Sequence, residues 1–371
     1  MKKLGFGLMR LPTLSDDVTN IDFEKLNKMV DVFMEKGFTY FDTAAPYHKG
    51  FSEIAFKNCV SSRYKREDYT VADKLSFFMI DKKEDMESFF EKQLEKLGVD
   101  YIDYYLLHAM GRPSYKKATD FDAFSFVQKK KAEGKIKSVG FSFHDKAEFL
   151  DEMLTAHPEM EFVQLQINYL DWEDVNIESK KCLEICKKHN KPVIVMEPVK
   201  GGSLVNIPDE ADELFKSLNK DASNASWAVR FAASCEGVFM VLSGMSNMEQ
   251  LNDNISFMED FKPLTKEEFD ATQKVSQIIK ESITVPCTNC KYCVDDCPKN
   301  IAIPDYFSAY NNLKRFGSKQ VVVAKTYYNN ISKEHGKASD CIACGKCEGH
   351  CPQHIEIRRH LKDVAAAFEK K

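Results

Sequence analysis

The chain has 371 residues, of which 43% are hydrophobic, and a formal net charge of −5. This length suffices for one large domain and a small one, and the slightly acidic balance argues against a nucleic acid or an anionic membrane as partner. No apolar run approaches the roughly 18 residues of a membrane helix, and the N-terminus lacks the apolar segment of a signal peptide, so we expect no membrane partner and a cytoplasmic location.

Short β-rich runs recur about every 30 residues and alternate with amphipathic helical stretches. The predicted strands are Leu4–Met9, Thr39–Phe41, Tyr69–Ala72, Ile102–Leu107, Ser138–Phe141, Phe162–Gln166, Val193–Met196 and Val238–Leu242. The clearest predicted helices are Asp22–Glu35, Lys83–Lys96, Asp122–Glu133, Lys146–His157 and Val175–His189. Eight strand–helix units predict an α/β fold of the (β/α)8 TIM-barrel type. A doubly wound sheet would usually have fewer units and a Gly-rich fingerprint after its first strand, which is missing here.

Polar side chains follow the second, third and fourth predicted strands, where barrel enzymes place their chemistry. Asp42 and Tyr47 follow the second strand, Lys74 the third, and His108 the fourth. An ammonium near a tyrosine is expected to lower its pKa, so that Tyr47 could donate a proton to a carbonyl oxygen. Asp42 would orient Lys74, and His108 would hydrogen-bond the same oxygen. Each residue alone could be a turn cap, a core group or a surface group, but the four together indicate a catalytic site.

Here the chain resembles the aldo/keto reductase family over roughly residues 1–260. The resemblance rests on Gly5-Phe6-Gly7, Phe41-Asp42-Thr43-Ala44 with Tyr47, Asp73-Lys74, Leu106-Leu107-His108, Gly134 through Ser142, Gln164 through Tyr169, and Ser243-Gly244-Met245 through Asn254. It implies a (β/α)8 barrel that reduces aldehydes and ketones with NADPH. It also implies that Asp42, Tyr47, Lys74 and His108 form the catalytic tetrad, with Tyr47 as proton donor.

The same resemblance implies the nucleotide contacts. Ser142 and Gln164 match the residues that hold the nicotinamide carboxamide, and the remaining contacts are Met196, Ser243, Gly244, Gln250 and Asn254. Three positions depart from the family pattern: Phe143 stands where Asn is usual, Met196 or Glu197 where an aromatic ring is usual, and the loop Gly244–Asn247 lacks the usual cation. The choice between NADPH and NADH therefore stays open. Lys200 could supply the missing charge, and Gly201-Gly202 could approach a pyrophosphate or form a plain loop.

Two cysteine runs occupy the last quarter of the chain, and both read C-x2-C-x2-C-x3-C-P, the spacing of bacterial two-cluster ferredoxins. The runs are Cys287, Cys290, Cys293 and Cys297, then Cys341, Cys344, Cys347 and Cys351. In such ferredoxins the fourth cysteine ligates the other cluster, so we assign Cys351 to the first [4Fe–4S] cluster and Cys297 to the second. A pair of zinc sites is the alternative, but zinc usually joins two C-x2-C pairs across a longer loop. The remaining four cysteines are interpreted as core residues: Cys59, Cys182, Cys186 and Cys235.

We expect the barrel to span residues 1–275 and a mainly α-helical ferredoxin-like domain to span residues 276–371. Predicted helices of the second domain are Pro304–Leu313, Val321–Ile331 and His360–Glu369. The fused tail resembles the iron–sulfur subgroup of the aldo/keto reductases, which is common in anaerobic prokaryotes.

Three functions are compatible with this pattern. The first is a carbonyl reductase acting on a small molecule, with the clusters as accessory carriers or structural elements. The second is an electron-transfer reductase in which the clusters feed a flavin or the substrate, because nicotinamide moves a hydride whereas a cluster moves one electron. A ferredoxin or flavodoxin would then be a natural partner, although no motif indicates a flavin. The third is a non-enzymatic redox-sensing module.

Overall fold

The computed structural model describes residues 2–175, 177–316 and 321–369. It divides into two compact units, one comprising Met1–Asp174, Glu178–Val199 and Ala225–Phe269, the other Val175–Ile177, Lys200–Asn224 and Asp270–Lys371. Three stretches of the predicted barrel domain, residues 175–177, 200–224 and 270–275, thus belong to the second unit. The domain limits 1–275 and 276–371 stay a prediction.

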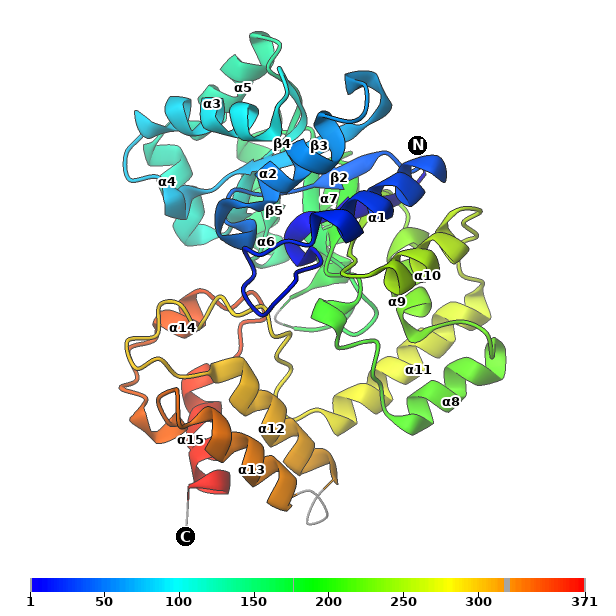
Figure 1. Cartoon of the computed structure of the whole chain (residues 1–371), viewed down its shortest axis with the longest axis vertical. Coiled ribbons are helices and arrows are strands. Elements are labelled where there is room, and N and C mark those ends of the chain that lie inside the picture. Colours follow the sequence, from blue (N-terminus) through cyan, green and yellow to red (C-terminus); the bar gives the residue numbers. More distant parts are fainter. Residues whose placement is uncertain (1, 176, 317–320, 370–371) are drawn as a thin grey trace. The chain divides into compact units, whose positions relative to one another are not determined.

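The first unit is a closed barrel of eight parallel strands in the order β1 to β8, which confirms the predicted fold class (Figure 1). The strands are β1 Leu4–Gly7, β2 Tyr40–Asp42, β3 Thr70–Leu75, β4 Ile102–Met110, β5 Ile136–Phe143, β6 Phe162–Gln166, β7 Val193–Met196 and β8 Val238–Gly244. The first strand ends two residues before its predicted limit, where the 3-10 turn Leu8–Arg10 begins.

Helices surround these strands (Figure 1). They are α1 Phe23–Glu35, α2 Ser52–Phe56, α3 Asp85–Leu97, α4 Arg112–Asp120, α5 Ala123–Ala132, α6 Ala147–Ala156, α7 Ser179–Lys188, α9 Asn224–Ser234 and α10 Met248–Met258. Helix α11, Lys266–Ser282, begins in the first unit and belongs mostly to the second. Local sequence explains their limits: Asp22 caps α1 by accepting from the Lys25 N–H, and Gly98 ends α3 at a φ of 66°. Helix α7 begins later than the predicted start at Val175, and residue 176 of that prediction lies outside the described residues.

The barrel interior is filled by side chains rather than open. One layer consists of Tyr40, Ala72, Leu106, Phe162, Ile194, Met240 and Leu242, all buried. Gly140 on β5 faces this layer closely, because a Cβ there would lie 2.5 Å from the Phe162 carbonyl oxygen. The packed interior leaves the strand ends as the place for functional side chains.

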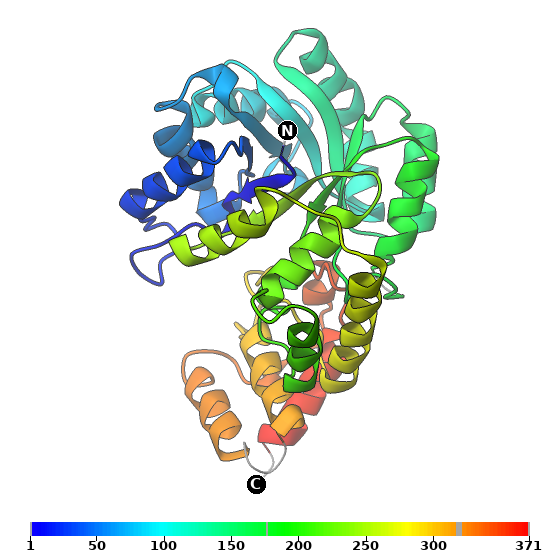
Figure 2. The same cartoon turned by 90° about the vertical axis from the view of Figure 1, so that its right-hand side faces the viewer.

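The second unit contains α8 Asp209–Leu218, α12 Ile303–Phe316, α13 Val321–Ile331, α14 Lys346–Gly349 and α15 Ile357–Phe368. Helix α12 packs against both α13 and α15, drawn in orange and red in Figure 2. Tyr306 and Tyr328 are buried between them, with ring centroids 4.6 Å apart. The predicted helices are present, and α12 and α15 are longer than predicted. No described helix is both long and apolar enough to cross a membrane.

Candidate active site and cluster sites

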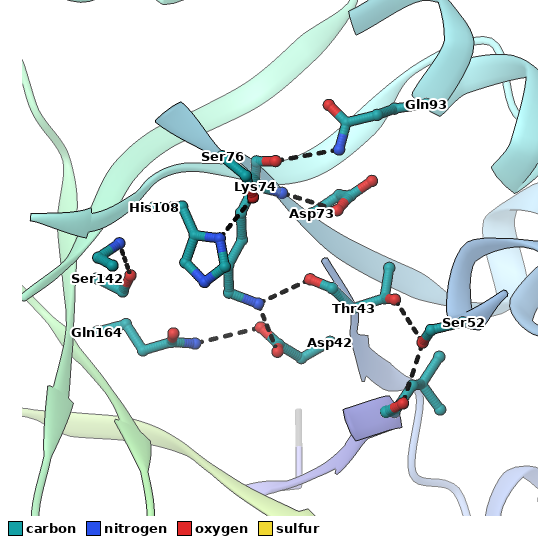
Figure 3. A network of polar contacts seen from close by, with 12 residues as sticks. Asp42, Thr43, Ser52, Asp73, Lys74, Ser76, Gln93, His108, Ser142 and Gln164 are labelled. Carbon is teal, nitrogen blue, oxygen red and sulfur yellow. Dashed lines mark hydrogen bonds and ion pairs between the residues drawn. The ribbon is translucent and has the colours of Figure 1, made fainter. Parts of the chain in front are cut away.

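The ends of β2, β3 and β4 bring Asp42, Lys74 and His108 together (Figure 3). Lys74 is 1% exposed, and its Nζ donates to Asp42 Oδ1 and to the Thr43 carbonyl oxygen, both at 2.7 Å. A buried pair is stable only with such short, well-directed bonds. Asp42 therefore holds the Lys74 ammonium in one place, as predicted for these two residues.

Tyr47 lies in the turn after β2 and is half-buried. The Lys74 Nζ is 5.1 Å from its ring centroid, and the His108 ring centroid is 6.3 Å away in an edge-on arrangement. All four residues predicted to form the tetrad are thus neighbours.

The prediction that Lys74 lowers the pKa of Tyr47 is wrong. Burial, followed by the negative charge of Asp42, raises the pKa of Tyr47 well above its usual value. The Lys74 charge is compensated by Asp42 at 2.7 Å and does not overcome burial. Tyr47 is therefore a protonated phenol at neutral pH, the form that can donate a proton.

His108 is buried and neutral. Burial, and after it the positive charge of Lys74, holds the pKa of His108 well below its usual value. Its Nδ1 lies 2.6 Å from the Oγ of Ser76, which is also buried. Ser76 stands two residues after Lys74, and nothing in the sequence pattern pointed to it.

A second layer positions the backbone of Lys74 (Figure 3). Gln93 Nε2 donates to the Lys74 carbonyl oxygen at 3.0 Å, and the Lys74 N–H donates to Asp73 Oδ1 at 2.8 Å. Tyr105 in turn donates its hydroxyl to Gln93 Oε1 at 2.6 Å. These residues lie on α3, β3 and β4, so their convergence depends on the fold and was not predictable from spacing.

Ser142 and Gln164 lie opposite each other in the register of β5 and β6. Gln164 Nε2 donates to Asp42 Oδ2 at 3.2 Å, and Ser142 Oγ accepts from the Ala109 N–H at 2.8 Å. The hydroxyl proton of Ser142 and the Oε1 of Gln164 then remain as one donor and one acceptor. A carboxamide offers the complementary acceptor and donor, so these residues fit a nicotinamide.

The other predicted nucleotide contacts lie at the end of β8, on the following helix α10, and at the end of β7. Asn254 donates to Ser243 Oγ at 2.9 Å, and Gln250 Oε1 accepts from the Ser246 N–H at 2.8 Å. Gly244 is exposed, and Met196 is half-buried at the end of β7.

Arg10 is a candidate that the sequence did not reveal. Its side-chain carbons cover Gly244, since a Cβ there would lie 3.3–3.4 Å from them, and its carbonyl oxygen accepts from Ser246 Oγ at 2.9 Å. Within the described part of the chain, the Arg10 guanidinium has no ion-pair partner. A cation therefore stands beside the β8 loop although the loop itself contains none.

The eight cysteines of the two runs line two separate hollows in the second unit. Site A is lined by Cys287, Cys290, Cys293 and Cys351, together with Thr288 and Gln353. Site B is lined by Cys297, Cys341, Cys344 and Cys347. Each hollow contains three cysteines of one run and the fourth of the other. Among the described residues, no His, Cys, Asp or Glu side chains converge as three ligands of a single metal ion. Four thiols around a hollow fit a cubane cluster by donor type and number.

Lys200 and Gly201, which the sequence offered as phosphate contacts, interact with the second unit. Lys200 is 3% exposed, belongs to the second unit, and donates to Gln353 Oε1 at 2.5 Å. Gly201 packs against Thr288. Within this unit both residues thus contact residues that line site A, and the phosphate contact stays an expectation.

A closed parallel barrel with polar groups at its strand ends defines the class of (β/α)8-barrel enzymes. Residues 3–277 match the model of the aldo/keto reductase family, and residues 286–356 match that of the 4Fe-4S dicluster domain. The chain belongs to the aldo/keto reductase family and has a C-terminal 4Fe-4S dicluster domain, which confirms the resemblance seen in the sequence.

Relatives and solved structures agree with this membership. An uncharacterized oxidoreductase of Bacillus subtilis, YtbE, is 27% identical over 189 residues, covering 50% of this chain and 63% of the relative. Another from the same organism, YqkF, is 24% identical over 306 residues, covering 74% of this chain and 92% of the relative. The holo form of an aldo-keto reductase from Bacillus halodurans superimposes with a TM-score of 0.60 at 25% identity, covering 74% of this chain and 91% of that one.

Proposed function

We propose that this protein reduces an aldehyde or ketone with a nicotinamide cofactor, with Tyr47 as proton donor. The observation that carries the proposal is the grouping of Tyr47 with the buried Asp42–Lys74 pair and the neutral His108. The hydroxyl donor of Ser142 and the Oε1 acceptor of Gln164 match a carboxamide, which supports nicotinamide as the cofactor. An aldo/keto reductase from Klebsiella pneumoniae has the same fold and was solved with NADP and acetate. This likeness is evidence for the fold of the chain and not for its cofactor.

The direct test is oxidation of NADPH or NADH that depends on an added aldehyde such as 4-nitrobenzaldehyde. Failure of the purified protein to oxidise either nucleotide in response to any of a panel of aldehydes and ketones would contradict the proposal.

In this mechanism each side chain has one task. Bound nicotinamide would supply the hydride. His108 donates a hydrogen bond to the carbonyl oxygen and so orients the carbonyl carbon toward the nicotinamide. Tyr47 donates its phenolic proton to that oxygen as negative charge develops. Lys74 packs against the Tyr47 ring and holds it in place, and Asp42 keeps Lys74 in position.

Ser76 selects the His108 tautomer that this task requires. If the Ser76 hydroxyl donates to Nδ1, the ring proton resides on Nε2, which can then donate to the substrate. We expect Ser76→Ala to lower kcat about tenfold, in line with the loss of one hydrogen bond, and Ser76→Thr to restore most of it. Nitrogen NMR of histidine-labelled protein should show mixed tautomers at His108 in the alanine variant alone. A wild-type tautomer pattern in Ser76→Ala would refute this role.

Arg10 supplies the charge that recognises the 2′-phosphate of NADPH. A charge-assisted hydrogen bond contributes about 1.5–3 kcal/mol, so Arg10→Met should reduce the preference in kcat/KM for NADPH over NADH by roughly tenfold to hundredfold. Arg359→Met removes an exposed cation of α15 and serves as control. An unchanged ratio in Arg10→Met would exclude Arg10 as the phosphate ligand.

We further propose that sites A and B each hold a [4Fe–4S] cluster. When bound, such a cluster would supply single-electron transfer. The clusters then serve as accessory carriers or structural elements beside the barrel chemistry, and an external ferredoxin or flavodoxin would exchange electrons with them.

A further inference from the structure

Lys200 is a buried cation that is linked to site A by a hydrogen bond. Its Nζ donates to Gln353 Oε1 at 2.5 Å, and Gln353 is itself buried and lines the hollow formed by Cys287, Cys290, Cys293 and Cys351. All these residues belong to the second unit, although Lys200 follows β7 of the barrel by only four residues in the chain.

The neighbouring backbone is packed against the same site. Gly201 has a φ of 63°, and a Cβ at this position would lie 2.4 Å from the carbonyl oxygen of Thr288. Thr288 follows Cys287 directly and lines site A. Only glycine permits this approach, so the Lys200–Gly201 segment is held against the loop that carries the first cysteine run.

Lys200 occupies this place at a cost in stability. Its φ is 49°, in the left-handed region that a side chain disfavours, and its ammonium is removed from water. An uncharged side chain would avoid the cost of burying an ammonium. Gly or Asn would avoid that cost and would also adopt the left-handed backbone more easily. Strain of this kind that persists in a fold often marks a functional position.

Gln353 links the Lys200 ammonium to site A, because it accepts from Lys200 Nζ and lines the hollow beside the four cysteines. The cations Lys299, Lys346 and Arg358 line site B, but they are exposed, whereas Lys200 is buried. Water and salt screen a buried charge less than an exposed one, so the Lys200 charge acts strongly on site A.

We propose that Lys200 raises the reduction potential of the cluster in site A. One-electron reduction takes a [4Fe–4S] cluster from the 2+ to the 1+ state, and a nearby ammonium stabilises the added negative charge in a medium of low dielectric. The proposal does not depend on carbonyl reduction by the barrel.

The test is an anaerobic redox titration of cluster-loaded protein with dithionite as reductant, followed by electron paramagnetic resonance. Lys200→Met keeps the length of the side chain and removes its charge. We expect one of the two midpoints to become more negative, by an amount equal to about a tenfold change in the reduction equilibrium, or about 59 mV for one electron. The other midpoint is the internal control and should stay in place. Lys200→Arg, which keeps the charge, should retain the wild-type midpoint.

A second pair of variants covers the case in which Lys200→Met does not keep its iron. Gln353→Glu places a carboxylate beside the ammonium and should lower the same midpoint, whereas Gln353→Met leaves the Lys200 charge in place and should lower it less. The proposal is overturned if iron-replete Lys200→Met shows unchanged midpoints, if both midpoints shift equally, or if Gln353→Glu and Gln353→Met behave alike.

Discussion

Replacement of Tyr47 by phenylalanine should lower kcat for aldehyde reduction by about 10²–10⁴-fold, the usual contribution of a positioned proton donor. The phenyl ring preserves packing against Lys74 and His108, so the affinity for nucleotide should remain near that of the wild type. Stopped-flow fluorescence of bound NADPH and steady-state turnover measure the two quantities separately. Tyr101→Phe, which removes the hydroxyl of a tyrosine stacked on Arg66, is the matched control.

The pH profile gives an independent check on Tyr47. Because burial raises its pKa well above the usual value, the phenol keeps its proton through neutral and mildly alkaline pH. Reduction by the wild type should therefore decline only at strongly alkaline pH, as the donor proton is lost. Turnover of Tyr47→Phe at the wild-type rate would remove Tyr47 from the mechanism.

Replacement of single cysteines should remove one cluster at a time, in a pattern that crosses the two runs. Cys351→Ala should empty site A and Cys297→Ala site B, although Cys351 belongs to the second run and Cys297 to the first. Cys344→Ala should likewise empty site B. Each variant should retain about half of the wild-type iron. The second unit should also be less stable in each, because cluster binding contributes to its folding free energy.

Iron analysis and the cluster absorbance measure these losses, and Cys235→Ala is the control because Cys235 is buried in the first unit outside both runs. The midpoint of the surviving cluster identifies the site. If Cys351→Ala and Cys344→Ala retained the same cluster, the crossed ligand assignment would be wrong; full iron content in both would exclude the cluster sites.

The parts of this protein that sequence predicts well are those governed by local pattern. Strand and helix periodicity predicted the barrel, and the cysteine spacing alone predicted the dicluster domain found by the family comparison. Asp42, Lys74 and His108 were recognisable because each stands at the end of a predicted strand.

The residues that were missed depend on contacts between distant parts of the chain. Arg10 meets Gly244 because β1 pairs with β8 when the barrel closes, more than two hundred residues apart. Lys200 was considered as a source of the charge that the β8 loop lacks, whereas in the structure it bonds to Gln353. The direction of the Tyr47 pKa shift was misjudged because the sequence shows that Lys74 is near but not that burial of the phenol outweighs its effect.

The measurement that tests the central claim most directly is isotope transfer from NADPH carrying deuterium at C4, in separate samples labelled on each face, to 4-nitrobenzaldehyde. If the tetrad performs reduction as proposed, one of the two labelled faces should deliver one deuterium to the carbonyl carbon of the alcohol, and Tyr47→Phe should form this product far more slowly. Alcohol formed without deuterium from either face, by protein whose clusters were being oxidised at the same time, would contradict the account and show that electrons reach the substrate through the clusters.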